Sequence, residues 1–413
     1  MKIRIAKGIK DNRKILILFF IVAWVLRIAY LSSRAERLII FGWIDWWDEM
    51  AQNFLIGRGF LAENPFGGSQ PFYALRGPIF PVFLLFNHLL FGNNFFLIKV
   101  MICLLNALTI FLIYDIAKGI FEKKIGLFAA AISAVFPTFI YFSIVSAPDI
   151  LATFLLAITI SLLLRGSRNN SYLINAIGGI ALGLTILCRS AYIAFLPFVL
   201  FWQGFVASSS SRGRKSVIIF LFTLLTMMPW VVRNYRIMHA FIPLSTNGGW
   251  VFWSANNPYM NKGPRGQCMP TEIGNLKEKL KRMSEVEADS YLRQITFSYI
   301  RKNPLLYCQR ALNRFGRFWA LFPHKKYYSY SFWLGSGVIY IPLFLLAFVG
   351  ALFAKEKQKD CSLFYFLFLS QTIVNMVTRA CIRYRLPIEP YLIILATFGF
   401  FVIRSKIKCQ KEF

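Results

Sequence analysis

Long apolar segments alternate with short polar ones along almost the whole sequence. A helix needs about 20 predominantly apolar residues to cross a bilayer, and we interpret ten apolar segments as spans. They are residues 15–33, 95–116, 125–143, 150–164, 172–188, 190–206, 216–232, 333–354, 361–378 and 386–403. The pattern therefore predicts an all-α, polytopic membrane protein with about ten transmembrane helices.

The charges that flank these segments predict their orientation. Six basic residues precede the first span, at Lys2, Arg4, Lys7, Lys10, Arg13 and Lys14. Cytoplasmic loops carry an excess of Lys and Arg, so the N-terminus is expected inside. Residues 78–92 are apolar but short and contain two prolines. We interpret them as a juxtamembrane helix on the outer face, because the other basic loops then lie inside and both termini are cytoplasmic.

Polar content divides the chain into three parts. An N-terminal transmembrane module at 1–232 contains the first outer loop at 34–94, an outer-face region follows at 233–331, and residues 332–413 hold the last spans. Helical periodicity predicts two amphipathic helices in the outer-face region, at 277–302 and about 305–320. The apolar stripe expected on the first helix is Leu280, Met283, Val286, Tyr291, Ile295 and Tyr299.

Three arginines share one stripe of the second amphipathic helix, at Arg310, Arg314 and Arg317. Long side chains of this kind often extend to lipid headgroups while their stems cover apolar surface. That interpretation and a functional one are equally supported by the sequence.

Composition agrees with a membrane location. Of the 413 residues, 57% are hydrophobic and 16% are charged, whereas a soluble domain is about half apolar and about a quarter charged. A net charge of +29 suggests nucleic acid as a partner in a soluble protein. Here we assign it to cytoplasmic loops and to contact with anionic lipid, so the lipid bilayer is an expected partner and nucleic acid is not.

Cysteines and histidines show no spacing typical of a metal site. Cys268 and Cys308 lie in the same outer region, and the sequence leaves their pairing open. His88, His239 and His324 are each interpreted as structural. Glycine-rich phosphate-binding motifs and Ser-His-Asp patterns are not recognised, so no cofactor is assigned with certainty, and the need for a divalent metal is left open.

Three carboxylates cluster just outside the first predicted span, at Asp45, Asp48 and Glu49. Ionisable groups close to hydrocarbon are costly and tend to be functional. A carboxylate at this place suits a general base that takes a proton from an acceptor hydroxyl or amine, and an ordinary solvated loop is the alternative. We expect Asp48 and Glu49 to be catalytic and Asp45 to support them.

Arginines accumulate at the outer ends of predicted spans, against the positive-inside rule. A guanidinium group binds phosphate oxygens in pairs. We therefore expect a phosphate to be held by Arg76, Arg189, Arg233, Arg383 and Arg385, with Arg379 beside them. For Arg76 alone, a headgroup anchor is an equal alternative. Asp149 either caps the helix that it begins or forms a second acidic site with Asp45.

Short motifs in these regions resemble those of GT-C type membrane glycosyltransferases, in particular the bacterial aminoarabinose transferases and the protein O-mannosyltransferases. The matching pieces cover nearly the whole chain. They are Asp48-Glu49 with Gly57-Arg58-Gly59-Phe60, Arg76-Gly77-Pro78-Ile79-Phe80-Pro81, Gly183-Leu184 to Arg189, Pro229 to Tyr235, Ser245 to Gly249 with Asn256-Asn257-Pro258, and Arg383-Tyr384-Arg385-Leu386-Pro387. Leu75 stands where the aminoarabinose transferases carry a glutamate, which puts their metal site in question here.

The resemblance implies a GT-C-like fold and an enzyme of the outer face of the bacterial inner (plasma) membrane. It implies transfer of a hexose or pentose from a polyprenyl-phosphate donor to a glycolipid such as lipid A, a glycan or a protein. Asp48 matches the family's catalytic acid, Arg76 its donor-phosphate contact and Asp149 its second outer-loop acid. The alternative function is a transporter or flippase for a polyprenyl-linked sugar, although the repeated halves that are frequent in transporters are not evident.

Overall fold

The computed structural model describes residues 2–34, 45–145, 147–259, 275–323 and 330–411. These residues form helices and no strand, with one isolated bridge between Ala62 and Phe72, so the all-α prediction is confirmed for them. The longer helices are α1 (Lys2–Ser32), α4 (Phe95–Ile120), α7 (Asp149–Arg168), α8 (Tyr172–Cys188), α10 (Arg212–Met238), α13 (Glu285–Lys302), α15 (Tyr330–Phe353), α16 (Gln358–Val377) and α17 (Glu389–Lys411). The shorter ones are α2 (Asp45–Leu55), α3 (Ile79–Phe91), α5 (Lys123–Val135), α6 (Pro137–Phe142), η2 (Ser190–Phe195), α9 (Leu196–Phe201), η3 (Trp202–Val206), α11 (Gly248–Ala255), α12 (Asn275–Lys281), α14 (Pro304–Phe318), η5 (Lys355–Lys357) and η6 (Ile382–Ile388).

Seven helical segments of the described chain are long and apolar enough to cross a membrane. They are Asn12–Ser32, Phe95–Ile120, Asp149–Arg168, Arg212–Met238, Trp333–Phe353, Lys355–Val377 and Ile382–Ile407. The other three predicted spans are helical but shorter or broken. The segment 125–143 divides into α5 and α6 at Phe136, which is extended because the following proline disfavours a helical conformation for the residue before it. Residues 190–206 form three short pieces, and α8 has 17 residues.

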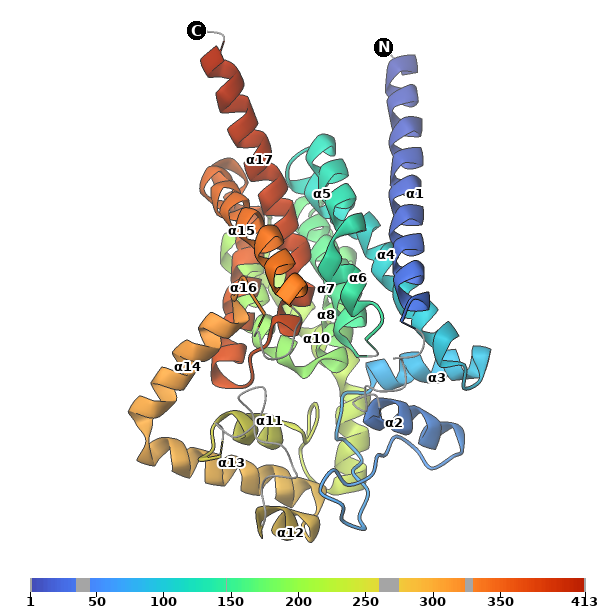
Figure 1. The fold of residues 1–413 in the computed structure, drawn as a ribbon, viewed down its shortest axis with the longest axis vertical. Coiled ribbons are helices and arrows are strands. Elements are labelled where there is room, and N and C mark those ends of the chain that lie inside the picture. Colours follow the sequence, from blue (N-terminus) through green and yellow to red (C-terminus); the bar gives the residue numbers. More distant parts are fainter. Residues whose placement is uncertain (1, 35–44, 146, 260–274, 324–329, 412–413) are drawn as a thin grey trace.

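The long helices pack into one bundle with α7 in its middle (Figure 1), in contact with α4, α8 and η6. Helix α1 packs on α4 and α5, and α15 packs along α17. The last pair approaches closely because a Cβ atom on Gly350 or Gly399 would overlap a main-chain carbonyl of the other helix. Small residues allow this kind of approach between helices in a membrane.

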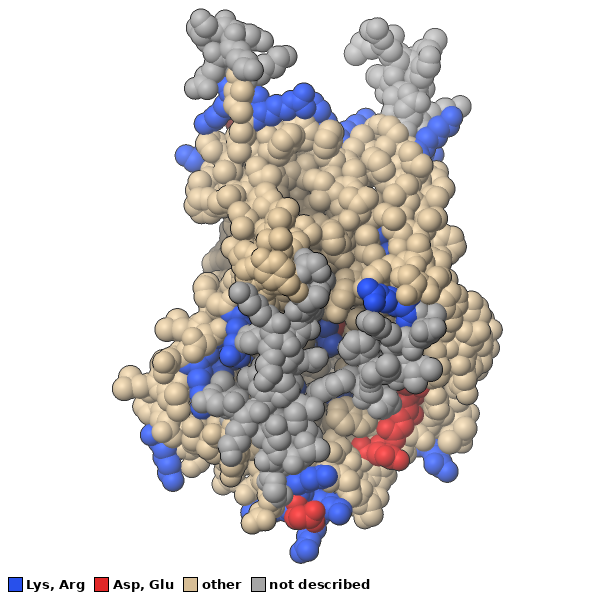
Figure 2. Space-filling view, in the orientation of Figure 1, with Lys and Arg blue, Asp and Glu red and all other residues tan. Residues whose placement is uncertain are grey.

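The short helices α2, α3 and α11–α14 gather at the end of the bundle that lies opposite both termini (Figure 1). Lys and Arg side chains surround the end that carries the termini, and the visible face between the two ends is largely uncharged (Figure 2). Helix α3 covers most of residues 78–92 and exposes Phe86, Leu89 and Leu90, which suits a helix in the membrane interface.

The amphipathic segment 277–302 is two helices rather than one. Helix α13 starts anew after Ser284, whose hydroxyl accepts from the main-chain N–H of Glu287 while the Glu287 carboxylate accepts from the N–H of Ser284. Such a capping box begins a helix. The face of α13 that is buried also differs from the predicted stripe, since it consists of Glu285, Ala288, Asp289, Leu292 and Thr296.

Two arginines of α14 are built into the fold. Arg310 donates to the carbonyl of Asn257 at 3.0 Å, and Arg314 donates to the carbonyls of Ala255 and Met376 at 2.8 and 2.6 Å. Both residues are buried, so neither extends to lipid headgroups. Arg317 is exposed.

Candidate functional site

The predicted acidic loop is a helix, α2, which begins at Asp45. The side chain of Asp45 lies outside the part of the chain that the structure describes. Asp48 is 7% exposed and turns inward, and its Oδ2 atom accepts from Nε2 of Gln52, one turn further along, at 2.6 Å. Glu49 is half-buried and accepts from the main-chain N–H of Glu63 at 2.7 Å. The two predicted catalytic acids therefore point in different directions from one helix.

His88, on the neighbouring helix α3, binds the other oxygen of Asp48. Its Nε2 atom lies 2.6 Å from Oδ1 of Asp48, and its Nδ1 atom lies 3.1 Å from the carbonyl of Gly92. The His88 side chain is 1% exposed. The sequence interpretation of His88 as a purely structural residue missed this contact, because nothing in the spacing of positions 48 and 88 indicates that α2 and α3 pack together.

Arg76 lies over two aromatic rings of α2. Its guanidinium carbon is 5.2 Å from the ring centre of Trp46 and 4.6 Å from that of Trp47, which are cation–π contacts. The loop is fixed by Gly77, where a Cβ atom would overlap the carbonyl of Leu187 at the end of α8. Arg76 is thus held between the residue next to Asp48 and the end of a bundle helix.

A second acid and two arginines meet beside Arg76, as expected from their common position at outer span ends. Asp149, the first residue of α7, is 2% exposed. It forms ion pairs with Arg189 and with Arg383, whose Nε atom lies 3.0 Å from Oδ2 of Asp149. Arg189 also lies over the ring of Tyr384, at 4.5 Å from its centre.

These charges form one group, which we name the arginine cluster: Arg76, Arg189, Arg379 and Arg383 with Asp149. Arg76 is within electrostatic range of Arg379 and Arg383. Arg189 and Arg383 pair with Asp149 and Arg76 lies near Arg383, so these three arginines and one carboxylate carry a net charge of +2. Burial lowers the pKa of Arg76 to about 10, and the group stays charged at neutral pH. Its Nε atom is buried and has no hydrogen-bond partner among the described residues.

Arg233 and Arg385 do not join the cluster through any contact that the described residues show. Arg233 donates to the carbonyls of Phe60 and Tyr73, both at 2.6 Å. Arg385 is fully buried and donates to the carbonyls of Phe318 and Ala320. Both guanidinium groups hold main chain in place.

Two buried carboxylates of α13 were not predicted from the sequence. Glu285 accepts from the main-chain N–H groups of Tyr73 and Ala74, at 2.5 and 2.9 Å, and from the hydroxyl of Thr246. Burial raises its pKa against the effect of these donors. Asp289 accepts from the main-chain N–H of Gly249 and binds Arg293. Their spacing of four residues placed them on one helix face, but we expected the apolar stripe to be the buried one.

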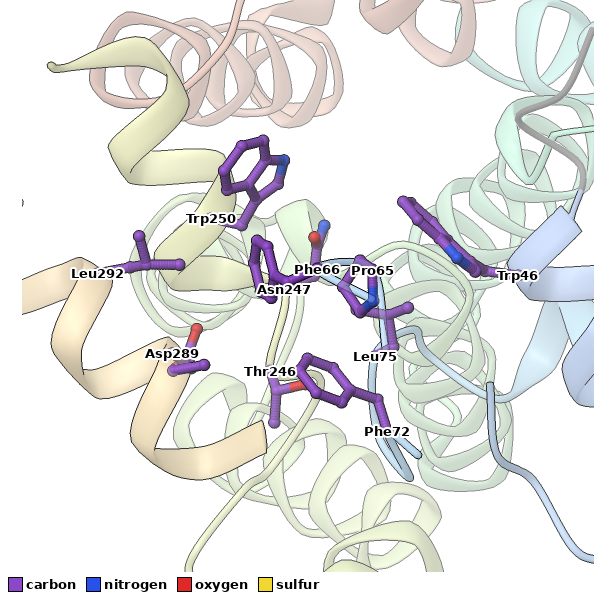
Figure 3. A pocket seen from close by; sticks show the side chains of 11 residues that line it. Trp46, Pro65, Phe66, Phe72, Leu75, Thr246, Asn247, Trp250, Asp289 and Leu292 are labelled. Atoms are coloured by element: carbon purple, nitrogen blue, oxygen red, sulfur yellow. The ribbon is translucent and has the colours of Figure 1, made fainter. Parts of the chain in front are cut away.

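A small pocket lies between the first outer loop and α13 (Figure 3). Trp46 stands across it from Trp250 and Leu292, and Asn247 and Asp289 supply polar atoms. Its volume of about 20 Å³ is enough for a water molecule. Among the described residues, no three His, Cys, Asp or Glu side chains converge in a way that would hold a metal ion.

Comparison with known proteins agrees with the resemblance. Residues 75–233 match the family model described as dolichyl-phosphate-mannose-protein mannosyltransferase. The sequence has no significant match among curated proteins.

Solved structures extend the similarity along the chain. The archaeal oligosaccharyltransferase AglB from Archaeoglobus fulgidus, in complex with an inhibitory peptide and a dolichol-phosphate, is 14% identical with a TM-score of 0.58, over 97% of this chain and 51% of its own. The complex of that enzyme with Zn and sulfate gives a TM-score of 0.59 at 14% identity, over 95% and 49% of the two chains. ArnT from Cupriavidus metallidurans, bound to undecaprenyl phosphate, is 13% identical over 93% of this chain and 77% of its own, with a TM-score of 0.39, which is too low to support a conclusion.

The present chain spans about half the length of the oligosaccharyltransferase that it matches. At such low identity, the match concerns the fold and leaves substrate and activity to be argued from the site. The predicted resemblance is confirmed: this chain is similar to the membrane glycosyltransferases of the GT-C type, in sequence over residues 75–233 and in fold over nearly its whole length.

Proposed function

We propose that this protein is a membrane glycosyltransferase that moves a sugar from a polyprenyl-phosphate donor to a glycolipid, glycan or protein acceptor. The observation that carries the proposal is that Arg76 of the arginine cluster packs on α2, the helix that carries Asp48. Arg76 lies over the rings of Trp46 and Trp47 in α2. A cationic site for a phosphate and a carboxylate that can take a proton are therefore both positioned by one helix, at the end of a membrane bundle (Figure 1).

The site faces the outside of the cell in this proposal. Figure 2 shows Lys and Arg at both ends of the bundle, but the short connections between long helices carry them at Lys118, Lys123, Lys124, Arg212, Arg214, Lys215, Lys355 and Lys357. An excess of Lys and Arg in short loops marks the cytoplasmic side, which is then the end that carries both termini. The opposite end, with α2, α3 and the arginine cluster, is then extracytoplasmic. Both termini lie in the cytoplasm, as expected for an enzyme of the bacterial plasma membrane.

The arginine cluster holds the donor phosphate. Guanidinium groups bind phosphate oxygens in pairs and keep their charge, and the single carboxylate of Asp149 against Arg76, Arg189 and Arg383 leaves positive charge for a further anion. The buried and unpartnered Nε atom of Arg76 is one donor for it. We assign the phosphate to Arg76, Arg189 and Arg383, while Arg233 and Arg385 support the surrounding main chain.

Asp48 then acts as the general base. The acceptor oxygen or nitrogen forms a bond to the anomeric carbon, and its proton moves to Asp48. The bond from that carbon to the donor phosphate oxygen breaks, and the electron pair leaves with the polyprenyl phosphate. The arginines stabilise the charge that develops on this leaving group, and they need no reorganisation because they are already in place.

Sugar transfer in proteoliposomes tests the proposal. The purified protein is given a panel of radiolabelled polyprenyl-phosphate hexoses and pentoses, and release of free polyprenyl phosphate is measured together with labelled acceptor. We expect Asp48→Asn to lower turnover at least about a hundredfold, the usual range for a lost general base. Glu278→Gln, at an exposed acid of α12, is the matched control.

Two results would overturn the assignment. Turnover in Asp48→Asn equal to the wild type would remove Asp48 from the role of base. Movement of intact donor between the leaflets, without cleavage of its sugar–phosphate bond, would identify the protein as a transporter of polyprenyl-linked sugars instead.

A further inference from the structure

We propose that His88 is a positioning residue for Asp48: as an imidazolium it binds Oδ1, keeps Asp48 ionised and leaves Oδ2 as the oxygen that takes the acceptor proton. The inference rests on the proposed function, because it assigns a partner to the general base. It starts from the geometry of one ring, which touches Asp48 at 2.6 Å and the Gly92 carbonyl at 3.1 Å.

Both ring nitrogens of His88 face atoms that only accept hydrogen bonds. A main-chain carbonyl has no hydrogen to give, so Nδ1 must carry a proton to bind Gly92. The carboxylate of Asp48 is likewise an acceptor when ionised. The pair therefore contains a second proton, which lies either on Nε2 of His88 or on Asp48.

The surroundings of Asp48 favour the first of these two arrangements. Its Oδ2 atom accepts from the side-chain N–H of Gln52 at 2.6 Å, and a hydrogen bond donated to a carboxylate stabilises the ionised form. Asp48 is thus ionised with one donor on each oxygen, and His88 is an imidazolium. The contact with His88 joins two opposite charges, whereas the contact with Gln52 joins one charge to a neutral amide. Since the attraction between two charges is added in the first contact, the bond to Gln52 is the one that yields to an acceptor.

The contact also fixes the position of the buried Asp48 carboxylate. His88 belongs to α3, Asp48 belongs to α2, and the two helices pack together. The His88 ring is fixed at its far side by the carbonyl that follows the end of α3. Asp48 is therefore oriented by the juxtamembrane helix, and displacement of α3 along the membrane surface would move the base.

Two conservative variants separate this role from a purely structural one. In His88→Gln the amide nitrogen falls near the place of Nε2, which preserves a donor to Asp48 and loses the contact to Gly92. In His88→Asn the amide nitrogen falls near Nδ1, which preserves the contact to Gly92 and loses the donor to Asp48. We expect kcat to fall about tenfold in the Gln variant and about a hundredfold in the Asn variant, within the range of one to two charged hydrogen bonds. The KM for the donor should not change, because neither variant touches the arginine cluster.

The opposite order of activity would refute the proposal. If His88 only caps the end of α3, the Asn variant keeps wild-type activity and the Gln variant loses it. The control is His239→Asn at an exposed histidine with a left-handed conformation, a conformation that Asn tolerates, and it should behave as the wild type.

A second measurement needs no substrate, so its failure is distinct from failure of the proposed function. The chain contains three histidines, and ¹⁵N-labelled imidazole signals in detergent micelles can be assigned by the same variants. We expect His88 to carry protons on both ring nitrogens at neutral pH and to lose the Nε2 proton in Asp48→Asn. An unprotonated Nε2 in the wild type would overturn the inference even if sugar transfer is observed.

Discussion

Removal of the Asp149 carboxylate is the sharpest test of the arginine cluster, because this one group pairs with both Arg189 and Arg383. Asp149→Asn keeps the shape of the side chain and removes its charge. The change removes the one carboxylate beside Arg76, Arg189 and Arg383, so the net charge of these groups rises from +2 to +3. We expect a less stable protein that binds phosphate more tightly.

The size of the effect follows from burial. The Asp149 and Arg189 side chains are 3% and 15% exposed, whereas Arg383 is 30% exposed. Breaking a buried ion pair costs about 3–5 kcal/mol, and a pair that is partly open to solvent adds at most about 1 kcal/mol. Asn still offers a carbonyl dipole, so we expect the lower end, about 3 kcal/mol. With about 2 cal/mol/K of unfolding entropy per residue, the melting temperature of a chain of 413 residues falls by about 4 °C.

Thermal unfolding in detergent, followed by tryptophan fluorescence, measures both consequences. Inorganic phosphate is added at fixed ionic strength against sodium chloride. Because phosphate no longer competes with Asp149, it should stabilise Asp149→Asn at concentrations at least about tenfold lower than it stabilises the wild type, which corresponds to about 1.4 kcal/mol. Asp360→Asn is the control, since its pair with Arg168 lies elsewhere and is more exposed, and should shift the melting temperature by less than about 1 °C.

Either of two outcomes would refute this reasoning. A melting temperature of Asp149→Asn within about 1 °C of the wild type would mean that the carboxylate does not compensate the arginines. Equal stabilisation by phosphate and chloride in both proteins would mean that the cluster is not a phosphate site.

Three further predictions concern the loop that carries Arg76. Arg76→Lys keeps the charge but loses the planar group that stacks on Trp47 and forms paired hydrogen bonds. The KM for a polyprenyl-phosphate donor should therefore rise about tenfold. An unchanged KM would remove Arg76 from the phosphate site. Gly77→Ala places a Cβ atom against the carbonyl of Leu187 and should displace Arg76 and lower kcat/KM at least about tenfold, while Gly213→Ala, which meets open space, should have no effect on the same assay. Burial raises the pKa of Glu285 above 4.5 in the folded protein. Its contribution to stability is therefore complete below that pH and is lost as the pH rises through the folded pKa. The wild type should lose stability relative to Glu285→Gln as the pH rises past 4.5, and parallel pH profiles of the two proteins would contradict the burial argument.

The positions of the long apolar helices were accessible from the sequence because membrane burial leaves a strong linear signal. An uninterrupted run of about twenty apolar residues is typical of a helix that crosses a bilayer, and basic residues mark one side. The break at Phe136 shows where this signal ends. Hydropathy does not register that Pro137 disfavours a helical conformation at the residue before it, so a single predicted span proved to be α5 and α6.

The site was only partly accessible, for a different reason. Arg189 and Arg383 stood out in the sequence because arginines at the predicted outer ends of spans break the positive-inside rule. Arg233 breaks the same rule but is bound to main-chain carbonyls. Sequence gives the sidedness of a charge and not its partner, since partners are set by packing between distant helices.

Glu285 and His88 are residues whose contacts the sequence did not indicate. Both are single ionisable residues in apolar or amphipathic helices, and such residues are commonly solvated or structural. Their importance comes from contacts across 211 and 40 positions of the chain. A helical periodicity of about 3.6 residues reports which face of a helix is buried, but it contains no information on what that face touches.

The loop that carries Arg76 connects the short helices at one end of the molecule with the bundle. The main chain of Tyr73 is held at its N–H by Glu285 of α13 and at its carbonyl by Arg233 of α10. Further along the same loop, Arg76 lies on α2 and the next residue lies on the end of α8. Arg76 is thus fixed by both layers at once, and Asp48 is fixed by α3 through His88. In the function proposed for this site, the phosphate ligand and the base depend on one packed interface between the outer helices and the bundle, so a change in that interface should alter donor affinity and turnover together.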